Sequence, residues 1–282
     1  MNGLPILYEN TEILVVDKPA GLAVQGGAGI FRSLDAVLES QCGFPVYLVH
    51  RLDKDTAGLL VVAKSSAAAS KWTRLVSGPL VHKEYTALCL GLPCRNGMLL
   101  RSGTLTDTVH AHGRAQEAVL HFAVERSSVV PLFSESRGDA HGKDCCAPSV
   151  EHKTCGDGVL EKHVSDCCIP LGGIIGDRDV PLHSESGGCI SSGDASLVLS
   201  LVRVRIETGR MHQIRIQLAK VGAPLVADDQ HGNFRQNKIA RRLGLKKMCL
   251  AATSLSIPLE GTERTFTTPL PPHMQNAVER WL

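Results

Sequence analysis

The sequence predicts an α+β protein with a mixed, largely antiparallel β-sheet flanked by helices and interrupted by one long insertion. Strands are indicated where apolar and polar residues alternate, over Glu84–Leu90 and Leu197–Ile206. Apolar residues at helical spacing predict a helix over Met211–Val221, with Gly222 ending it. The insertion is indicated by an abrupt change of composition between Ser127 and Ser196.

The first quarter of the chain reads as strand, turn and helix. Ile13–Val16 is a short apolar run, and the Lys18–Gly21 segment that follows it has turn composition. Ser65 and Ser66 are suited to cap a helix that continues through Ala67–Val76.

Two segments on either side of the insertion are expected to pair. If Leu197–Ile206 lies beside Val119–Val124, the insertion becomes an excursion from an antiparallel hairpin. Cys249–Ile257 supplies a further strand near the end of the chain.

We therefore predict one domain over residues 1–282, with residues 127–196 as an insertion that lacks a fixed fold. This insertion is rich in Gly, Ser, Cys and His, and Val130–Ser136 recurs within it as Val180–Ser186. Duplicated polar sequence of this kind is typical of a surface excursion, because it has too little apolar surface to form a core.

The cysteines of the insertion do not predict a metal site. Six of the ten cysteines of the chain lie there, with histidines between them, but no C-x-x-C pair is present. Adjacent cysteines are poor zinc chelators, so we predict no metal, and an intracellular chain would keep these thiols reduced.

Composition points to an intracellular protein, with the cytoplasm preferred and the nucleus or an organelle left open. The hydrophobic fraction is 43%, and no apolar stretch is long enough to span a membrane. The start at Met1–Pro5 has no secretion signal or presequence pattern. The oligomeric state is not predicted.

The formal net charge is only +2, so any affinity for a polyanion depends on where the charges lie. Basic residues gather between Lys238 and Lys247, whereas acids are frequent between Glu135 and Asp194. A basic working face and an ordinary solvated surface are both compatible with this cluster.

The segment that carries most information about function is His50–Gly58, which reads HRLDKDTAG. It places four charges directly before an apolar strand, which is costly unless those charges are paired or used. Three other blocks accompany it: Ile13–Gly21, Lys83–Tyr85 and Glu207–Arg215.

These four blocks, in this order, resemble the RluA-type family of RNA pseudouridine synthases, and especially its RluC-like branch. The resemblance covers about Ile6–Arg126 and Leu197–Leu282. It implies the pseudouridine-synthase catalytic fold, without a preceding S4-like module, and isomerisation of specific uridines in RNA. Ribosomal RNA is the preferred substrate and transfer RNA the alternative. The reaction changes no oxidation state, so no cofactor is expected.

The resemblance also assigns the reacting groups. Asp53 occupies the position of the catalytic aspartate, and it can act as a nucleophile or as a base. Asp55 is the rival carboxylate. Arg215 is the expected partner that keeps Asp53 ionised and oriented, and Tyr85 is expected to stack on the target base.

A uridine in structured RNA must be extruded to reach a buried carboxylate. Arg51 resembles the residue that fills the resulting gap, although a phosphate contact or an ion pair with Asp55 would also explain it. The full set of predicted RNA-binding residues is Arg51, His50, Lys83, Arg210, His212 and Gln213.

Three positions depart from the family pattern. Ala57 replaces a serine, Gln217 replaces a histidine, and Ala251 stands where a histidine is common. A fold does not guarantee an activity, so a non-catalytic RNA-binding or ribosome-assembly protein on the same fold is the competing hypothesis. The presence of all three central residues favours the enzyme.

Overall fold

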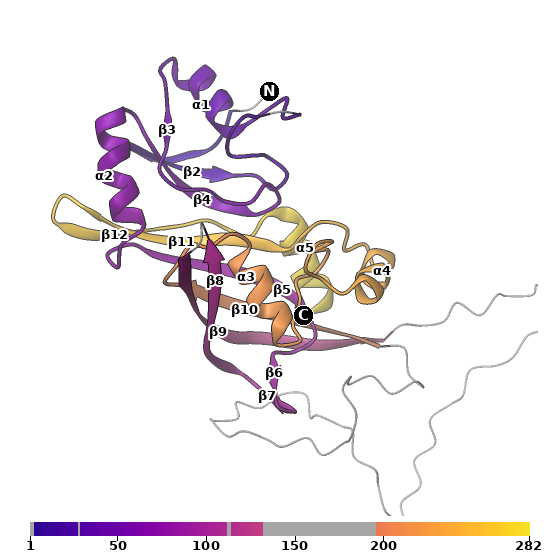
Figure 1. Ribbon diagram of the computed structural model, residues 1–282. Helices are drawn as coiled ribbons and strands as arrows, with labels where there is room; N and C mark the ends of the chain where they lie inside the picture. The colour runs from indigo at the N-terminus through magenta and orange to yellow at the C-terminus, as the bar shows by residue number, and fades with distance from the viewer. Residues whose placement is uncertain (1–2, 28, 112–113, 132–195) are drawn as a thin grey trace, which may run out of the picture. The chain divides into compact units, whose positions relative to one another are not determined.

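A computed structural model describes residues 3–27, 29–111, 114–131 and 196–282 (Figure 1). These residues form a 10-stranded sheet, a two-stranded ribbon and five helices. The strands are β1 (Ile6–Glu9), β2 (Ile13–Lys18), β3 (Tyr47–Leu48), β4 (Ala57–Ala63), β5 (His82–Leu90), β6 (Cys94–Arg95), β7 (Met98–Leu99), β8 (Ser102–Ala111), β9 (Arg114–Pro131), β10 (Ser196–Ile206), β11 (Leu250–Leu259) and β12 (Thr262–Thr267). The helices are α1 (Leu34–Cys42), α2 (Ser66–Val76), α3 (Gln213–Lys220), α4 (Phe234–Arg242) and α5 (Pro272–Trp281).

The sheet runs in the order β1-β2-β4-β11-β5-β10-β9-β8, with β3 beside β4 and β12 beside β11. Its neighbouring strands are antiparallel except for β4 and β11, which are parallel. The mixed, largely antiparallel sheet predicted from the sequence is therefore confirmed.

The parallel contact between β4 and β11 joins the N-terminal strands to the rest of the sheet. It is short, with Ala57 opposite Ala251 and Gly58 opposite Ala252. Gly58 has a φ of +108°, and a Cβ atom there would lie 2.2 Å from the carbonyl oxygen of Ala252. Only glycine fits so close an approach of two backbones.

Two of the three departures from the family pattern meet at this contact. Ala57 and Ala251 are register partners, and both are buried. The two small side chains fill adjacent positions in one core cluster, so the two departures are neighbours in space.

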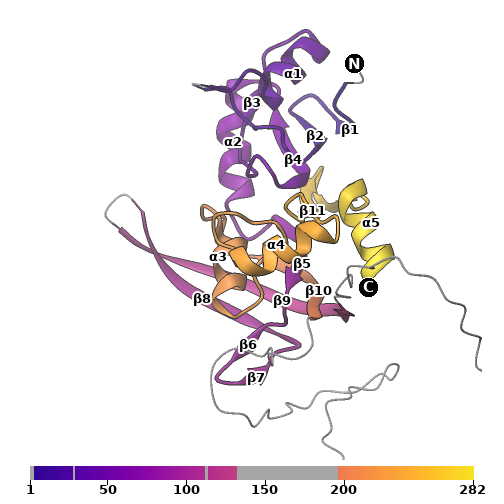
Figure 2. The ribbon, with the colours of Figure 1, turned by 90° about the vertical axis from the view of Figure 1, so that its right-hand side faces the viewer.

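Helices cover both faces of the central strands (Figures 1 and 2). Along β5, Ala87 and Cys89 belong to the cluster that includes α1 and α3, whereas Leu88 and Leu90 belong to the cluster of α4 and α5. A third cluster packs Trp72 of α2 beneath the N-terminal strands. Alternate residues of one strand thus face opposite layers, as the sequence alternation predicts.

The strand and helix predictions are largely confirmed. The hairpin across the insertion is present, since Val202 pairs with Val124 and Ile206 with Leu120. The cap of α2 is Ser65, whose side chain accepts a hydrogen bond of 3.2 Å from the Ala68 amide.

Two predicted boundaries were wrong. The helix expected from Met211 begins at Gln213, because His212 has a left-handed φ of 53° that no helical residue adopts. The insertion expected from Ser127 overlaps β9, since residues 127–131 pair with β10. The remaining predictions for the insertion concern residues 132–195, which lie outside the described residues.

Across the described ranges, none of the five helices has the length and hydropathy that a membrane span requires.

Candidate active site

Asp53 lies in the loop between β3 and β4, where the backbone is tied down on both sides. The Thr56 amide donates to the carbonyl oxygen of Asp53 at 3.2 Å, and the Gly21 amide donates to that of Lys54 at 2.9 Å. The Asp53 side chain is 30% exposed, so its carboxylate is held in place yet open to a ligand.

Lys18 anchors the same loop from the protein interior. Its side chain is fully buried and its Nζ donates to the carbonyl oxygens of Pro19, Leu22 and Lys54, at 3.1, 2.8 and 2.9 Å. Burial lowers the pKa of Lys18 to about 8, although Asp55 and Asp53 act in the opposite direction. The sequence predicted a turn over Lys18–Gly21, but it did not predict that Lys18 would anchor the loop of Asp53.

Arg215 of α3 reaches Asp53, as predicted. Its Nη1 donates to Asp53 Oδ2 at 3.2 Å, and its side chain is only 9% exposed. Asp55, the rival carboxylate, is exposed and forms no ion pair within the described part of the chain. The geometry therefore favours Asp53 over Asp55 as the residue that Arg215 orients.

A second carboxylate, Asp228, holds Arg215 more closely, and sequence reasoning missed it. Arg215 Nε donates to Asp228 Oδ2 at 2.7 Å and Nη2 donates to Oδ1 at 2.8 Å, a bidentate pair in which the Asp228 side chain is 1% exposed. Nη2 also donates to Gln230 Oε1 at 3.1 Å. Hydrogen bonding to Asp228, above all other causes, raises the pKa of Arg215.

The turn that carries Asp228 is built to keep the carboxylate charged. Burial alone would raise the pKa of Asp228, but donation from Arg215 and from the amides of His231 and Gln230 lowers it overall. The buried Asn237 of α4 fixes the turn, because its Nδ2 donates to the Asp228 carbonyl oxygen at 2.8 Å. The only sequence signal was an acid directly after an apolar run.

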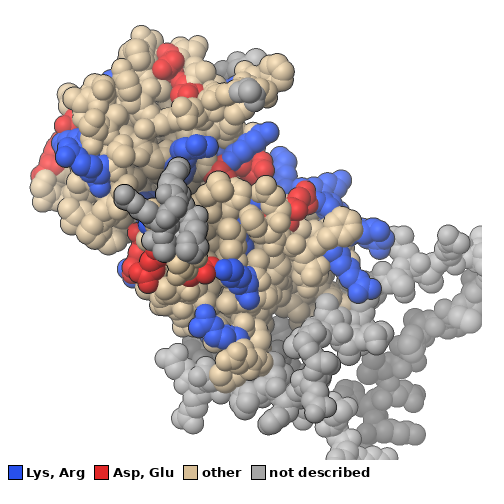
Figure 3. Space-filling model, in the orientation of Figure 1, with Lys and Arg blue, Asp and Glu red and all other residues tan. Residues whose placement is uncertain are grey.

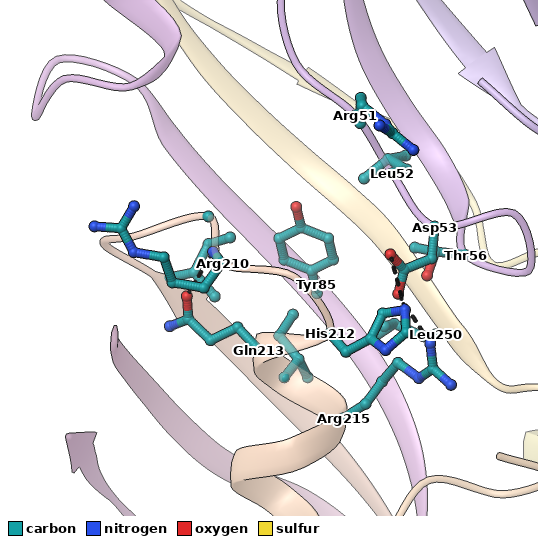
Figure 4. Close-up of a pocket in the computed structure, with 13 residues that line it drawn as sticks. Arg51, Leu52, Asp53, Thr56, Tyr85, Arg210, His212, Gln213, Arg215 and Leu250 are labelled. Atoms are coloured by element: carbon teal, nitrogen blue, oxygen red, sulfur yellow. Dashed lines mark hydrogen bonds and ion pairs between the residues drawn. The ribbon is translucent and has the colours of Figure 1, made fainter. Parts of the chain in front are cut away.

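Tyr85 lies on β5 with its ring at the floor of the site and is 6% exposed. Burial raises the pKa of its hydroxyl, and the nearby Asp53 adds to this effect. Tyr85 is therefore neutral over the working range of pH. Figure 4 shows its ring between Arg210 on one side and the pair of Asp53 and Arg215 on the other.

These residues line a cleft of about 850 Å³. All of the site residues predicted from the sequence line it except Gln213, which lines a smaller hollow beside it. A volume in this range is that of ordinary ligand sites and is ample for one nucleotide. Segments far apart in the sequence thus converge on one opening.

Two of the predicted RNA-binding residues make structural contacts. His50 Nε2 accepts a hydrogen bond of 3.0 Å from the Val61 amide, and burial, followed by the charge of Lys83, lowers its pKa to about 3. Lys83 Nζ donates to the Val76 carbonyl oxygen at 2.8 Å. His50 is therefore neutral, while Arg51 is exposed at the wall of the cleft.

Gln213 uses its side-chain amide inside the protein. Its Oε1 accepts from Thr208 Oγ1 at 2.9 Å and from the Arg210 amide at 3.1 Å, while its Nε2 donates to the Val119 carbonyl oxygen at 3.0 Å. This geometry fixes the turn that presents Arg210. It favours a positioning role for Gln213 over the RNA contact expected from the motif.

His212 stands between Asp53 and the Asp228 turn. Its Nε2 lies 3.9 Å from Asp53 Oδ1, and its Nδ1 is 2.9 Å from Nε2 of His231. The left-handed backbone of His212 turns its side chain back over the start of α3, toward the cleft. His231, like Asp228, was not identified from the sequence.

Comparison with known proteins identifies this arrangement. Residues 12–220 match the family described as RNA pseudouridylate synthase. Ribosomal large subunit pseudouridine synthase D of Xanthomonas campestris is 27% identical over 98% of this chain and 68% of its own. The tRNA pseudouridine synthase C of Yersinia pestis is 27% identical over 94% of this chain and 85% of its own.

Among solved structures, human RNA pseudouridylate synthase domain containing 4 superposes with a TM-score of 0.60 and 19% identity, over 98% of this chain and 92% of that one. That likeness supports the fold alone. Because the family match spans most of the chain and contains Asp53, Tyr85 and Arg215, the protein belongs to the RluA-type family of RNA pseudouridylate synthases.

Proposed function

We propose that this pseudouridine synthase isomerises specific uridines of ribosomal RNA to pseudouridine, with Asp53 as the reacting carboxylate. The observation that carries the proposal is the contact of Arg215 with Asp53 inside a cleft whose volume is sufficient for a nucleotide. It supports the enzyme over a non-catalytic RNA-binding protein on the same fold, because a buried, doubly held arginine aimed at one carboxylate has no evident use in RNA binding alone.

The chemistry needs few parts. The C1′–N1 bond of the uridine breaks, the base turns, C5 joins C1′, and the proton of C5 is lost while N1 gains one. Electrons balance without a redox partner, so no cofactor is required. An ionised Asp53 can add to the ribose or base, or remove a ribose proton to form a glycal. Arg215 favours the ionised form in each route.

Tyr85 and Arg51 serve the extruded nucleotide in this proposal. The Tyr85 ring provides a flat apolar surface on which the uracil stacks, and its neutral hydroxyl is available as a hydrogen-bond donor. The exposed Arg51 guanidinium stands at the wall of the cleft, where it can fill the gap left in the RNA stack or contact a phosphate.

The choice of ribosomal RNA rests on the relatives. The two relatives from Xanthomonas campestris and Pseudomonas aeruginosa are both ribosomal large subunit pseudouridine synthase D. A transfer-RNA substrate is the second candidate, since the relative from Yersinia pestis is a tRNA pseudouridine synthase.

The test is tritium release from unmodified transcripts that carry tritium at uracil C5. Joining C5 to the ribose expels this hydrogen, so release reports the reaction directly. We expect release from large-subunit ribosomal RNA and little from a pool of transfer RNAs. Release from transfer RNA alone would reject the proposed substrate, and binding of both RNAs without release from either would favour the non-catalytic protein.

A further inference from the structure

The exposed face of α4, together with the turn after it, is strongly basic and has no acidic residue of its own. Between Asn233 and Met248 the chain has six Lys or Arg residues and no Asp or Glu. The six are Arg235, Lys238, Arg241, Arg242, Lys246 and Lys247, and we call this set the α4 basic surface. Figure 3 shows Lys and Arg side chains gathered over α4.

This surface has little internal compensation. Of these six residues, only Arg241 forms an ion pair with a residue in the described ranges, and its partner is Asp229. Lys238 stands three residues from Arg235 and four from Arg242, spacings at which like charges on a helix repel. A solvated helix commonly has acids at these spacings, and their absence here means that an anionic partner would relieve the repulsion between the basic side chains.

The α4 basic surface is joined directly to the active site. On its buried side, Asn237 of α4 donates to the backbone carbonyl oxygen of Asp228, the residue whose carboxylate holds Arg215. The turn before α4 contributes His231, which contacts His212 at the cleft. The basic face and the reacting carboxylate thus belong to one connected structure.

Two large apolar side chains lie exposed at this junction. Met211 lines the cleft and is 81% exposed, and Phe234, the first residue of α4, is 79% exposed. His212, the residue after Met211, contacts His231, which lies three residues before Phe234, so the two exposed side chains belong to segments that meet beside the cleft. An exposed aromatic ring next to basic side chains is the combination that binds single-stranded or splayed nucleotides.

We propose that the RNA segment flanking the target uridine runs from the cleft over Met211 and Phe234 and along the α4 basic surface. Phe234 stacks on an unpaired base, and Arg235, Lys238 and Arg242 contact successive phosphates. This inference rests on the proposed function for the identity of the RNA, but the surface itself is argued from charge, exposure and continuity with the cleft.

The experiment uses the full chain and an unmodified transcript of large-subunit ribosomal RNA, tritiated at uracil C5. The test variant combines Arg235→Gln, Lys238→Gln and Arg242→Gln. The matched control combines Arg74→Gln, Arg95→Gln and Arg126→Gln, three exposed arginines on other elements. Both variants change the net charge equally, so non-specific attraction falls equally in each.

We expect the test variant to raise KM for the RNA about 10-fold or more at moderate salt, with kcat unchanged. The slope of log affinity against log salt should fall by about two to three, since each lost phosphate contact removes a little less than one from it. The control should change the slope by less than one. Phe234→Ala should weaken binding about 5-fold or more with the slope unaltered, because stacking releases no ions.

Equal effects of the two triple variants on slope and KM would overturn the proposal. So would a test variant that loses affinity for vesicles of phosphatidylcholine and phosphatidylserine while its affinity for RNA stays at the wild-type value. If wild type binds the RNA with the predicted salt dependence but releases no tritium, the proposed function is wrong, whereas the α4 basic surface is still supported as an RNA-binding surface. Matching thermal unfolding curves establish that the variants are folded.

Discussion

Arg215 is bound more closely by Asp228 than by Asp53. Two guanidinium nitrogens of Arg215 donate to Asp228 at 2.7 and 2.8 Å, whereas Nη1 donates to Asp53 at 3.2 Å. Asp228 thus fixes the plane of the guanidinium, and Nη1 of Arg215 then faces the carboxylate of Asp53. The cleft keeps Asp53 partly exposed, so a ligand can reach its carboxylate.

Replacing Asp228 by Asn should cost both stability and turnover. The buried Arg215 would lose the closer of its two carboxylate partners, and breaking such a pair costs about 3 kcal/mol of unfolding free energy. We expect kcat to fall at least about 10-fold, since a shift of the guanidinium near 1 Å can cost up to about 100-fold. Urea unfolding and tritium release measure the two effects.

The matched control is the next residue along the chain. Asp229→Asn removes an exposed ion pair with Arg241, so unfolding free energy should change by less than about 1 kcal/mol and kcat should not change. If Asp229→Asn lowers kcat as much as Asp228→Asn, the specific role assigned to Asp228 is wrong.

Gly58→Ala should disrupt the junction of the sheet. The added methyl would lie 2.2 Å from the Ala252 carbonyl oxygen, and the φ of +108° is strained for alanine. Since backbone cannot move aside cheaply, we expect a loss of about 3 kcal/mol or more, or a failure to fold. Gly26→Ala, whose nearest atom is 3.5 Å away, is the control and should unfold like wild type. Circular dichroism during urea titration distinguishes the two.

Lys18→Met should change how stability depends on pH. The folded pKa of Lys18 is about 8 and the ordinary value is 10.5, so the unfolded chain binds more protons between these limits. Wild-type stability should therefore rise as pH increases from 8 to 10.5, by up to about 3 kcal/mol. The variant should lack this rise.

At pH 7 the same variant should be less active than wild type. It removes the Lys18 donor from three carbonyl oxygens, including that of Lys54 in the loop of Asp53, which keeps only the Gly21 amide. Each unmet group costs about 1–3 kcal/mol, offset in part by removing a buried charge. A Lys18→Met protein with wild-type kcat and an unchanged rise above pH 8 would contradict the anchoring role.

His231→Gln should weaken the dependence of stability on acid pH. Burial lowers the folded pKa of His231 below its ordinary 6.5, so on acidification the unfolded chain takes up this proton first. The contribution of His231 to wild-type stability is therefore full above pH 6.5 and is lost as pH falls below it. Thermal unfolding between pH 7 and pH 5 should show a smaller decline in the variant. An identical decline of stability in both proteins would show that the titration of His231 does not contribute to the acid dependence of stability.

Much of the fold could be predicted because local patterns determined it. The alternation of apolar and polar residues in Leu197–Ile206 and Val119–Val124 is that of β-strands. Their pairing could be predicted because the polar composition of the segment between them indicated an insertion into a hairpin. The helix start could not be predicted, because spacing does not reveal that His212 turns left-handed.

The site was predicted only where a motif carried it. Asp53, Tyr85 and Arg215 were assigned by resemblance. The structure places all three in the lining of one hollow, and their roles stay predictions. Asp228 was missed because its interaction with Arg215 arises only after the chain has folded. No motif or periodic pattern in the sequence marks it. For Gln213 the motif indicated importance but not orientation, and its amide faces the protein.

The measurement that tests the central claim most directly is tritium release by Asp53→Asn beside Asp55→Asn. Asn keeps the shape of the carboxylate but removes its charge, so Arg215 and the cleft should persist. We predict normal RNA binding with turnover reduced at least about 10,000-fold for Asp53→Asn, on the scale of losing a group that acts covalently. Asp55→Asn should retain turnover close to wild type. Full release by Asp53→Asn, or loss confined to Asp55→Asn, would contradict the account.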